Sequence, residues 1–311
     1  GLSDNIMNII LHMGYPKTAT TFLQSNVFSV DTKLNFLGPN QDVIAELVKS
    51  CRVLSDDEFD QAKAGIRENL AAVLSQDKLN VISHEHLLDV KEFSFPGGVD
   101  LCRAFARVHE LLASFGDVKV MFFIRKHDEM LKSYCSEHFM SMVYYRFTAR
   151  SISRLVNRLP SFKKAFLLDQ FRYFETYSFL CNEIGESRVK LFLYEEFRDD
   201  TDKVLLDIYS FMKAEYNPSN FDLNKRANSS ADKTLFNRVG MILKKLKWSD
   251  IAKLRFYVAA TFYYVDPFHN KKYNFSDLPN MTTEITDYFA ADTALFENPE
   301  IKEKLTHYKY L

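Results

Sequence analysis

The stretch that most constrains the fold of this chain lies near its amino terminus, at residues 8–24. An apolar run at residues 9–13 is bounded by Gly14 and Pro16, which is the pattern of a short, fully buried strand in a parallel sheet. Lys17 and a threonine-rich segment follow, and they indicate the start of a helix. The sequence therefore predicts a strand, a tight loop and a helix in immediate succession.

This loop and the helix start behind it carry the chemistry of an anion site. The first turn of a helix has unpaired backbone N–H groups, which attract negative charge. Lys17 adds one cation, and Thr18, Thr20 and Thr21 add hydroxyl groups. Together these residue types are typical of phosphate binding. The alternative is a threonine-rich helix cap without a ligand, because capping needs only one hydroxyl.

The spacing of the loop indicates which kind of phosphate it suits. The nucleotide-binding pattern G-x-x-x-x-G-K-[ST] has two glycines, which let a wide loop wrap the β- and γ-phosphates. Here the second glycine is missing, and Gly14 lies only three residues before Lys17. The shorter loop favours a 5′-phosphate group over a triphosphate tail.

A second phosphate signature follows another apolar run, at residues 118–124. This run ends at Arg125, and Ser133 comes eight residues later. A guanidinium offers phosphate a bidentate fork, and a hydroxyl completes the contact. An arginine after a strand is usually part of a surface ion pair. Combined with the Lys17 loop, however, Arg125 and Ser133 predict a second phosphate group at some distance from the first.

The segment after the strand expected at residues 79–83 offers groups that can accept a proton. In open parallel sheets, ligands bind beyond the carboxyl ends of the strands, where Ser83-His84-Glu85-His86 would lie. A carboxylate or an imidazole there can take the proton of an attacking hydroxyl. We favour Glu85, then His84, then His86. If the strand continues, the two histidines share one face and Glu85 takes the other. The alternative is a solvated polar loop with a helix cap.

Three motifs, taken as a set, resemble the sulfotransferase family that uses 3′-phosphoadenosine 5′-phosphosulfate on a fold related to P-loop kinases. They are Gly-x-x-Lys-Thr-x-Thr-Thr at residues 14–21, Ser-x-Glu at residues 83–85 and Arg-x7-Ser at residues 125–133. The resemblance extends over most of residues 8–213. It implies transfer of a sulfuryl group to a hydroxyl or amine of a glycan or small-molecule acceptor without a metal, with Lys17 stabilising the leaving phosphate.

The resemblance also implies roles for other residues. Glu85 or His84 would take the acceptor proton. Ala19 stands where the family often has glycine, which is a mild change if residue 19 is helical. Tyr194 would lie near the adenine, although packing is an equally frequent role for such a tyrosine. Arg226 would replace a closing segment that this chain lacks. The residues implied in binding the co-substrate are Gly14, Lys17, Thr18, Ala19, Thr20, Thr21, Arg125, Ser133, Tyr194 and Arg226.

The order of strands and helices predicts one α/β domain of three layers, a P-loop-like parallel sheet flanked by helices. Its core is expected at about residues 6–215, with mostly helical additions at about residues 216–311. Strands are expected at residues 9–13, 79–83, 118–124 and 189–193, with a short extended piece within residues 31–38. Helices are expected at residues 41–51, 56–76, 102–115, 171–184 and 201–212.

Composition restricts the class of protein. The 311 residues are 47% hydrophobic and 26% charged, with a formal net charge of −1, so a nucleic acid polymer is not expected as a partner. The four cysteines lie far apart without metal-ligand spacing, and no apolar run is long enough for a transmembrane segment. We therefore expect a cytoplasmic protein. The sequence leaves open the acceptor, the oligomeric state and whether a targeting segment precedes Gly1.

Two other functions stay open. A P-loop kinase or NTPase would use ATP with Mg²⁺, although the third expected strand ends in Arg125 and not in the aspartate with which such enzymes hold the metal. A catalytically inactive nucleotide-binding module would bind the nucleotide and serve as an interaction protein.

Overall fold

The structure is a computed structural model that describes residues 6–15, 17–87, 98–131, 133, 168–224 and 281–311. Its contacts divide the chain into two compact units. The first unit comprises residues 1–126, 169–227 and 290–311, and the second comprises residues 127–168 and 228–289. The expected single domain, with its boundary near residue 215, stays a prediction.

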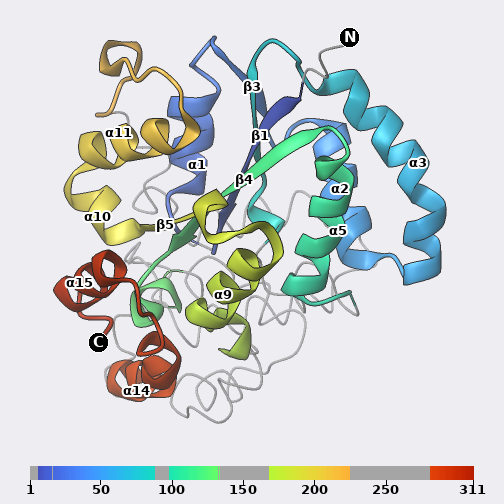
Figure 1. The fold of residues 1–311 in the computed structure, drawn as a ribbon. Helices are drawn as coiled ribbons and strands as arrows, with labels where there is room; N and C mark the ends of the chain where they lie inside the picture. Colours follow the sequence, from blue (N-terminus) through green and yellow to red (C-terminus); the bar gives the residue numbers. More distant parts are fainter. Residues whose placement is uncertain (1–5, 16, 88–97, 132, 134–167, 225–280) are drawn as a thin grey trace, which may run out of the picture. The chain divides into compact units, whose positions relative to one another are not determined.

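A sheet of five parallel strands lies at the centre of the first unit (Figure 1). The strand order is β2-β3-β1-β4-β5, so β1 lies between β3 and β4. This parallel sheet with its flanking helices confirms the predicted α/β fold class. The strands are β1 (Met7–Gly14), β2 (Leu34–Leu37), β3 (Leu79–Ser83), β4 (Gly116–Ile124) and β5 (Val189–Leu193).

Helices lie on both faces of this sheet, which gives the first unit three layers (Figure 1). One face carries α1 (Thr20–Leu23), α10 (Tyr194–Asp199) and α11 (Thr201–Met212). The other carries α2 (Asp42–Val53), α3 (Asp56–Val73), α5 (Leu101–Ala113) and α9 (Tyr173–Ile184). Two further helices are α14 (Met281–Thr293) and α15 (Pro299–His307).

The expected helices are confirmed, with small shifts at their ends. The one expected from residue 171 begins at Tyr173, after a 3-10 turn at Leu168–Phe171. Among the described helices, none combines the length and apolarity that crossing a lipid bilayer would require.

Local sequence signals fix where two of these helices begin. Ser55 caps α3: its hydroxyl accepts from the Glu58 N–H at 3.3 Å, and the Glu58 carboxylate accepts from the Ser55 N–H at 2.8 Å. This reciprocal pair is the capping box, which satisfies N–H groups that a helix start leaves open. Asp100 caps α5 by accepting from the Arg103 N–H at 2.8 Å.

Alternation along the strands directs large apolar side chains to the layer that contains α1 and α11. Ile10 of β1, Phe123 of β4 and Phe192 of β5 are buried in one cluster with Leu205 and Ile208 of α11. The rings of Phe123 and Phe192 stack with centroids 5.0 Å apart. Burying an aromatic or aliphatic side chain of this size stabilises a fold by about 1.5–3 kcal/mol.

Asn80 in β3 ties together the amino-terminal ends of several elements and is fully buried. Its side-chain oxygen accepts from Asn35 Nδ2 at 2.7 Å and from the Ser75 N–H at 2.8 Å. Its amide group donates to the carbonyls of Ser75 at 2.8 Å and Asn8 at 3.2 Å. One side chain thus links β1, β2, β3 and the segment after α3.

We expect Asn80→Ala to lower the free energy of unfolding by about 3 kcal/mol, because it leaves several buried polar groups without their partner. Chemical denaturation would measure this loss. Asn69→Ala, at an exposed position of α3, is the matched control and should stay within about 0.5 kcal/mol of the wild type. Equal effects of the two substitutions would contradict the role of Asn80.

Candidate phosphate-binding site

The loop between β1 and α1 follows Gly14, where a side chain would crowd Thr18. A Cβ atom on Gly14 would lie 2.5 Å from Thr18 Oγ1 and 3.3 Å from Thr20 Oγ1. Thr18 is fully buried, and its hydroxyl donates to the Tyr15 carbonyl at 2.8 Å. The Thr18 hydroxyl therefore holds the loop closed. Thr20 and Thr21 form the first turn of α1 and are half-buried and exposed, respectively.

The backbone of this loop is left-handed at two residues that are not glycine. Lys17 has φ 67° and Ala19 has φ 65°, whereas Thr18 between them has no positive φ. A left-handed residue beside a residue of negative φ can turn successive N–H groups toward one point, an arrangement that favours anion binding. Ala19 also immediately precedes α1 and gives it no side-chain cap.

Residue 19 is therefore not helical, so the condition under which its methyl group would be a mild change is not met. A left-handed residue with a Cβ atom costs about 1–2 kcal/mol relative to the right-handed form, and only glycine avoids this cost. The neighbouring Lys17 carries a similar cost.

Ala19→Gly should raise the free energy of unfolding by about 0.5–1 kcal/mol, because relief of the left-handed strain exceeds the added flexibility of the unfolded chain. Ala64→Gly is the control at an exposed helical position of α3, and it should lower stability by about 1 kcal/mol. Thermal or urea unfolding of both variants gives the comparison. A loss at both positions would mean that residue 19 is not strained.

Arg125 and Tyr194 lie directly beyond the carboxyl ends of β4 and β5. The register pairs Gly14 with Phe123 and Ile124 with Leu193, so these ends lie beside the loop. Arg125 Nη1 donates to the Lys17 carbonyl at 3.0 Å, and its guanidinium lies over the Tyr194 ring, 4.2 Å from the centroid. Three residues that the sequence singled out thus meet at one edge of the sheet.

The backbone around Arg125 is held by side chains that sequence reasoning did not identify as part of a site. The Tyr173 hydroxyl donates to the Arg125 carbonyl at 2.5 Å. The Lys126 N–H donates to Glu195 Oε1 at 2.7 Å, and the Tyr310 hydroxyl donates to Glu195 Oε2 at 2.7 Å. Glu195 gives a weak sequence signal because it follows a strand, whereas Tyr310 gives none.

One atom of Arg125 lacks a hydrogen-bond partner among the described residues. Its Nε is buried and makes no hydrogen bond to any residue that the structure describes. Guanidinium groups bind phosphate through such donors. Together with the closely packed Gly14 loop and the cation of Lys17, this donor fits the phosphates of a nucleotide.

The segment that we expect to accept a proton follows β3 at the same edge of the sheet. His12 of β1 is in register with Ser83 of β3, so Gly14 and Glu85 each lie two residues beyond this paired position. The strand ends at Ser83, and Glu85 opens a 3-10 turn, Glu85–Leu87. The strand does not continue past Ser83, so the expectation that His84 and His86 share one strand face does not apply. His84 is buried and Glu85 is exposed.

Two predicted co-substrate residues lie outside the described residues of the first unit. Ser133 belongs to the second unit, where it is half-buried. Arg226 lies outside the described residues.

His12 is a buried residue near the loop that sequence reasoning did not single out. It is 1% exposed, its Nδ1 lies 2.7 Å from Ser83 Oγ, and its ring meets the edges of Phe28 and Phe123. Burial lowers the pKa of His12 from 6.5 to about 3. The only sequence signal for His12 was that a polar residue stands among the apolar residues of a strand.

This pKa shift predicts a pH dependence of stability. The unfolded chain gains a proton at His12 below about pH 6.5, whereas the folded chain gains one only near pH 3. The contribution of neutral His12 to the free energy of unfolding is fully present above pH 6.5 and is lost as the pH falls toward 3. Between pH 6.5 and pH 5, the free energy of unfolding of the wild type should therefore fall by about 1.5 kcal/mol more than that of His12→Asn.

Urea unfolding of both proteins at each pH would measure that difference. All other residues are the same in both proteins, so their contributions to the pH dependence cancel. Parallel stability curves for the wild type and the variant would contradict a neutral, buried His12.

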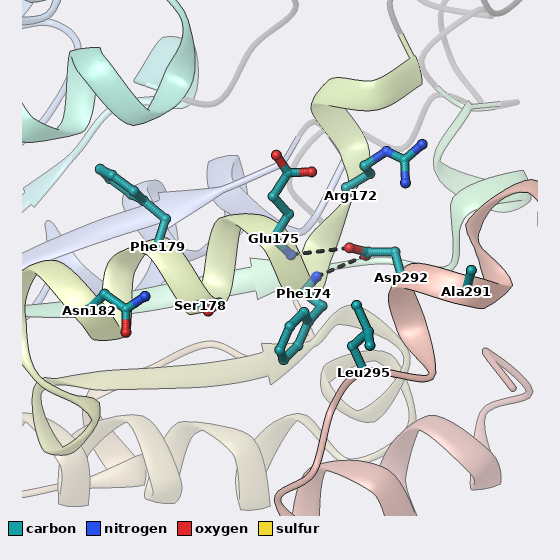
Figure 2. A pocket seen from close by; sticks show the side chains of 9 residues that line it. All are labelled: Arg172, Phe174, Glu175, Ser178, Phe179, Asn182, Ala291, Asp292 and Leu295. Carbon is teal, nitrogen blue, oxygen red and sulfur yellow. Dashed lines mark hydrogen bonds between the residues drawn. The ribbon is translucent and has the colours of Figure 1, made fainter.

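A separate pocket of about 480 Å³ lies on the first unit, between α9 and residues 291–295 (Figure 2). Asp292 accepts from the N–H groups of Phe174 at 3.0 Å and Glu175 at 3.2 Å, which caps the start of α9. Burial raises the pKa of this carboxyl group. No predicted site residue is among the described residues that line the pocket: Arg172, Phe174, Glu175, Ser178, Phe179, Asn182, Ala291, Asp292 and Leu295.

No protein-family model matches this chain, and no curated protein matches it either. Its fold is similar to that of sulfotransferases of known structure. A sulfotransferase from Alicyclobacillus acidocaldarius is 13% identical with a TM-score of 0.42, over 84% of this chain and 97% of that chain. Mouse sulfotransferase SULT7A1, complexed with PAP, is 13% identical with a TM-score of 0.44, over 99% of this chain and 91% of that chain.

The sulfotransferase domain of the Synechococcus PCC 7002 olefin synthase is 15% identical with a TM-score of 0.38, over 94% of this chain and 97% of that chain. At these TM-scores, the likeness assigns neither an activity nor a substrate to this chain.

Proposed function

We propose that this chain is a sulfotransferase that moves a sulfuryl group from 3′-phosphoadenosine 5′-phosphosulfate to a hydroxyl or amine of a glycan or small-molecule acceptor. One observation carries this proposal: the short loop with its single Gly14 lies beside Arg125, which donates to the Lys17 carbonyl and covers the Tyr194 ring. A cation, a guanidinium fork and an aromatic face thus lie together at the carboxyl edge of a parallel sheet. Such edges are where nucleotides bind.

Each of these groups has a distinct task in the proposed reaction. The loop N–H groups and Lys17 hold the 5′-phosphate, and the Lys17 ammonium stabilises the charge that grows on its departing oxygen. Arg125 provides the fork for a further phosphate group, and Tyr194 offers a face to the adenine. The loop is too short for a triphosphate tail, which favours this donor over ATP.

The acceptor must lose a proton as its oxygen or nitrogen attacks the sulfur. A bond forms between the acceptor atom and sulfur while the bond from sulfur to the phosphate oxygen breaks. Glu85 follows the strand next to β1 and is exposed, so it can meet an acceptor directly. His84 is the second candidate base. Either would take the acceptor proton.

Titration calorimetry tests the donor. We expect 3′,5′-adenosine bisphosphate to bind and ATP with Mg²⁺ to bind much more weakly. Tight ATP binding without bisphosphate binding would instead identify a P-loop kinase or NTPase. Bisphosphate binding without sulfate transfer to any acceptor in a broad panel of glycans and metabolites would identify an inactive binding module.

Lys17→Ala should lower turnover by about 10²-fold or more and affect bisphosphate affinity much less, because its charge matters most in the transition state. Steady-state kinetics and calorimetry measure the two effects separately. Lys49→Ala, an exposed lysine of α2, serves as the charge control and should leave both unchanged. Equal losses of binding and turnover in Lys17→Ala would assign this lysine a purely positional role.

Glu85→Gln should lower turnover by about 10²- to 10⁴-fold with bisphosphate binding intact, because glutamine keeps the size of the side chain but accepts no proton. His84→Asn should cost much less. The reverse order of effects, with the acid limb of the rate profile near pH 6.5, would make His84 the base. Near-full activity in both variants would move the proton acceptor to another residue, with His86 the next to test.

A further inference from the structure

Beneath the phosphate loop, three polar side chains from separate segments meet in the interior. They are His12 of β1, Ser83 of β3 and Gln24, which opens the π-helix Gln24–Phe28 directly after α1. Their exposed fractions are 1%, 0% and 7%. Ser83 Oγ lies 2.7 Å from His12 Nδ1 and accepts from Gln24 Nε2 at 2.9 Å. We call these three residues the buried polar cluster.

The donors in this cluster fix the direction of its hydrogen bonds. The Gln24 amide nitrogen only donates, so Ser83 Oγ accepts from it and has its own proton left to give. Among the described atoms, His12 Nδ1 lies close enough to accept this proton in a hydrogen bond. The ring proton of neutral His12 is therefore on Nε2. His12 Nε2 is buried and has no hydrogen-bond partner among the described residues. Burying a polar group without a hydrogen-bond partner lowers the stability of a fold, so we expect His12 to have a role that compensates for this cost.

The position of the cluster indicates that role. His12 precedes Gly14 by two residues, Ser83 directly precedes His84, and Gln24 directly follows the last residue of α1. The cluster therefore joins three segments that the proposed reaction uses: the strand entering the loop, the helix leaving it and the strand that carries the base. The π-helix is consistent with this role, because wide helical turns recur at functional sites.

We propose that the buried polar cluster is a positioning device that holds the segment His84–Glu85 at a fixed distance from the loop at residues 14–19. This inference rests on the proposed function. His12 is a positioning residue because it acts through Ser83, one residue before His84. A misplacement of the base by about 1 Å can cost on the order of 10²-fold in rate, so a small shift of Ser83 matters.

The test compares two substitutions of His12 with a structural control. His12→Leu removes the acceptor of the Ser83 proton, whereas His12→Asn keeps a hydrogen-bonding atom close to the position of Nδ1. Tyr209→Phe is the control, because it also removes a buried hydrogen bond, the one from the Tyr209 hydroxyl to Asp31 Oδ2 at 2.6 Å. Tyr209 belongs to α11 and not to the strands or the turn around the base segment.

Sulfate transfer from the donor is the first readout. His12→Leu should lower kcat by roughly 10- to 100-fold and change the KM for the donor by less than about threefold. His12→Asn should recover most of the lost kcat, and Tyr209→Phe should stay within about twofold of the wild type. A kcat for His12→Leu no lower than that of Tyr209→Phe, or no recovery in His12→Asn, would overturn the proposal.

Amide hydrogen exchange is the second readout, and it does not depend on activity. His12→Leu should speed exchange at residues 84–87, and Tyr209→Phe should not. Should the wild type transfer no sulfate, the proposed function fails, yet exchange still decides whether the cluster holds this segment. Unchanged exchange at residues 84–87 would overturn the inference even in an active enzyme.

If His12→Leu does not fold, Gln24→Met replaces it, because it removes the amide donor to Ser83 and keeps a side chain of similar length. It should show the same selective loss of kcat and the same faster exchange at residues 84–87. A normal kcat and normal exchange in Gln24→Met would overturn the proposal.

Discussion

The parallel pairing of β1 on both of its sides is the constraint on which the other features depend. β1 pairs with β4 along its whole length and with β3 from Ile9 to His12. A strand fixed in this way cannot slide, and its carboxyl end is set level with those of its neighbours. The carboxyl ends of parallel strands lie at the same edge of a sheet. The loop after Gly14, the segment after Ser83 and Arg125 therefore all lie at that edge.

Buried polar groups fix this register at both ends of β3. Asn80 makes its hydrogen bonds near the amino-terminal end, and Ser83 makes its own with His12 and Gln24 at the carboxyl end. Apolar side chains on a strand can pack against different apolar partners. A shift of the register of β3 by one residue, however, would turn Asn80 and Ser83 to the opposite face and break these hydrogen bonds. Hydrogen bonds between buried polar groups therefore specify one arrangement where apolar contacts alone would allow several.

The strained backbone at Lys17 and Ala19 persists because its surroundings determine it. The Arg125 guanidinium donates to the Lys17 carbonyl, and Thr18 donates back to the Tyr15 carbonyl. The backbone of Arg125 is in turn fixed by Tyr173. These contacts offset the cost of the left-handed residues and keep the loop in this conformation.

The neighbourhood of Arg125 joins segments that are distant in sequence. Glu195, buried after β5, accepts from the Lys126 N–H and from the Tyr310 hydroxyl, and Tyr310 lies 115 residues further along the chain. The C-terminal segment of the first unit therefore supports the same edge of the sheet as the loop near the amino terminus.

The sequence by itself determined the elements and their order. Apolar runs between turn residues predicted the strands, and helical spacing predicted α3 and its neighbours. The position of Gly14, Lys17, Arg125 and Tyr194 at or just beyond strand ends was predictable because strand ends are local features. Only the tertiary structure decided the left-handed backbone of Ala19, the bond from Arg125 to the Lys17 carbonyl, and the partners of His12 and Tyr310. The physical reason is that local patterns encode local backbone preferences, whereas these contacts depend on strand order and register, which bring together residues that no local pattern connects.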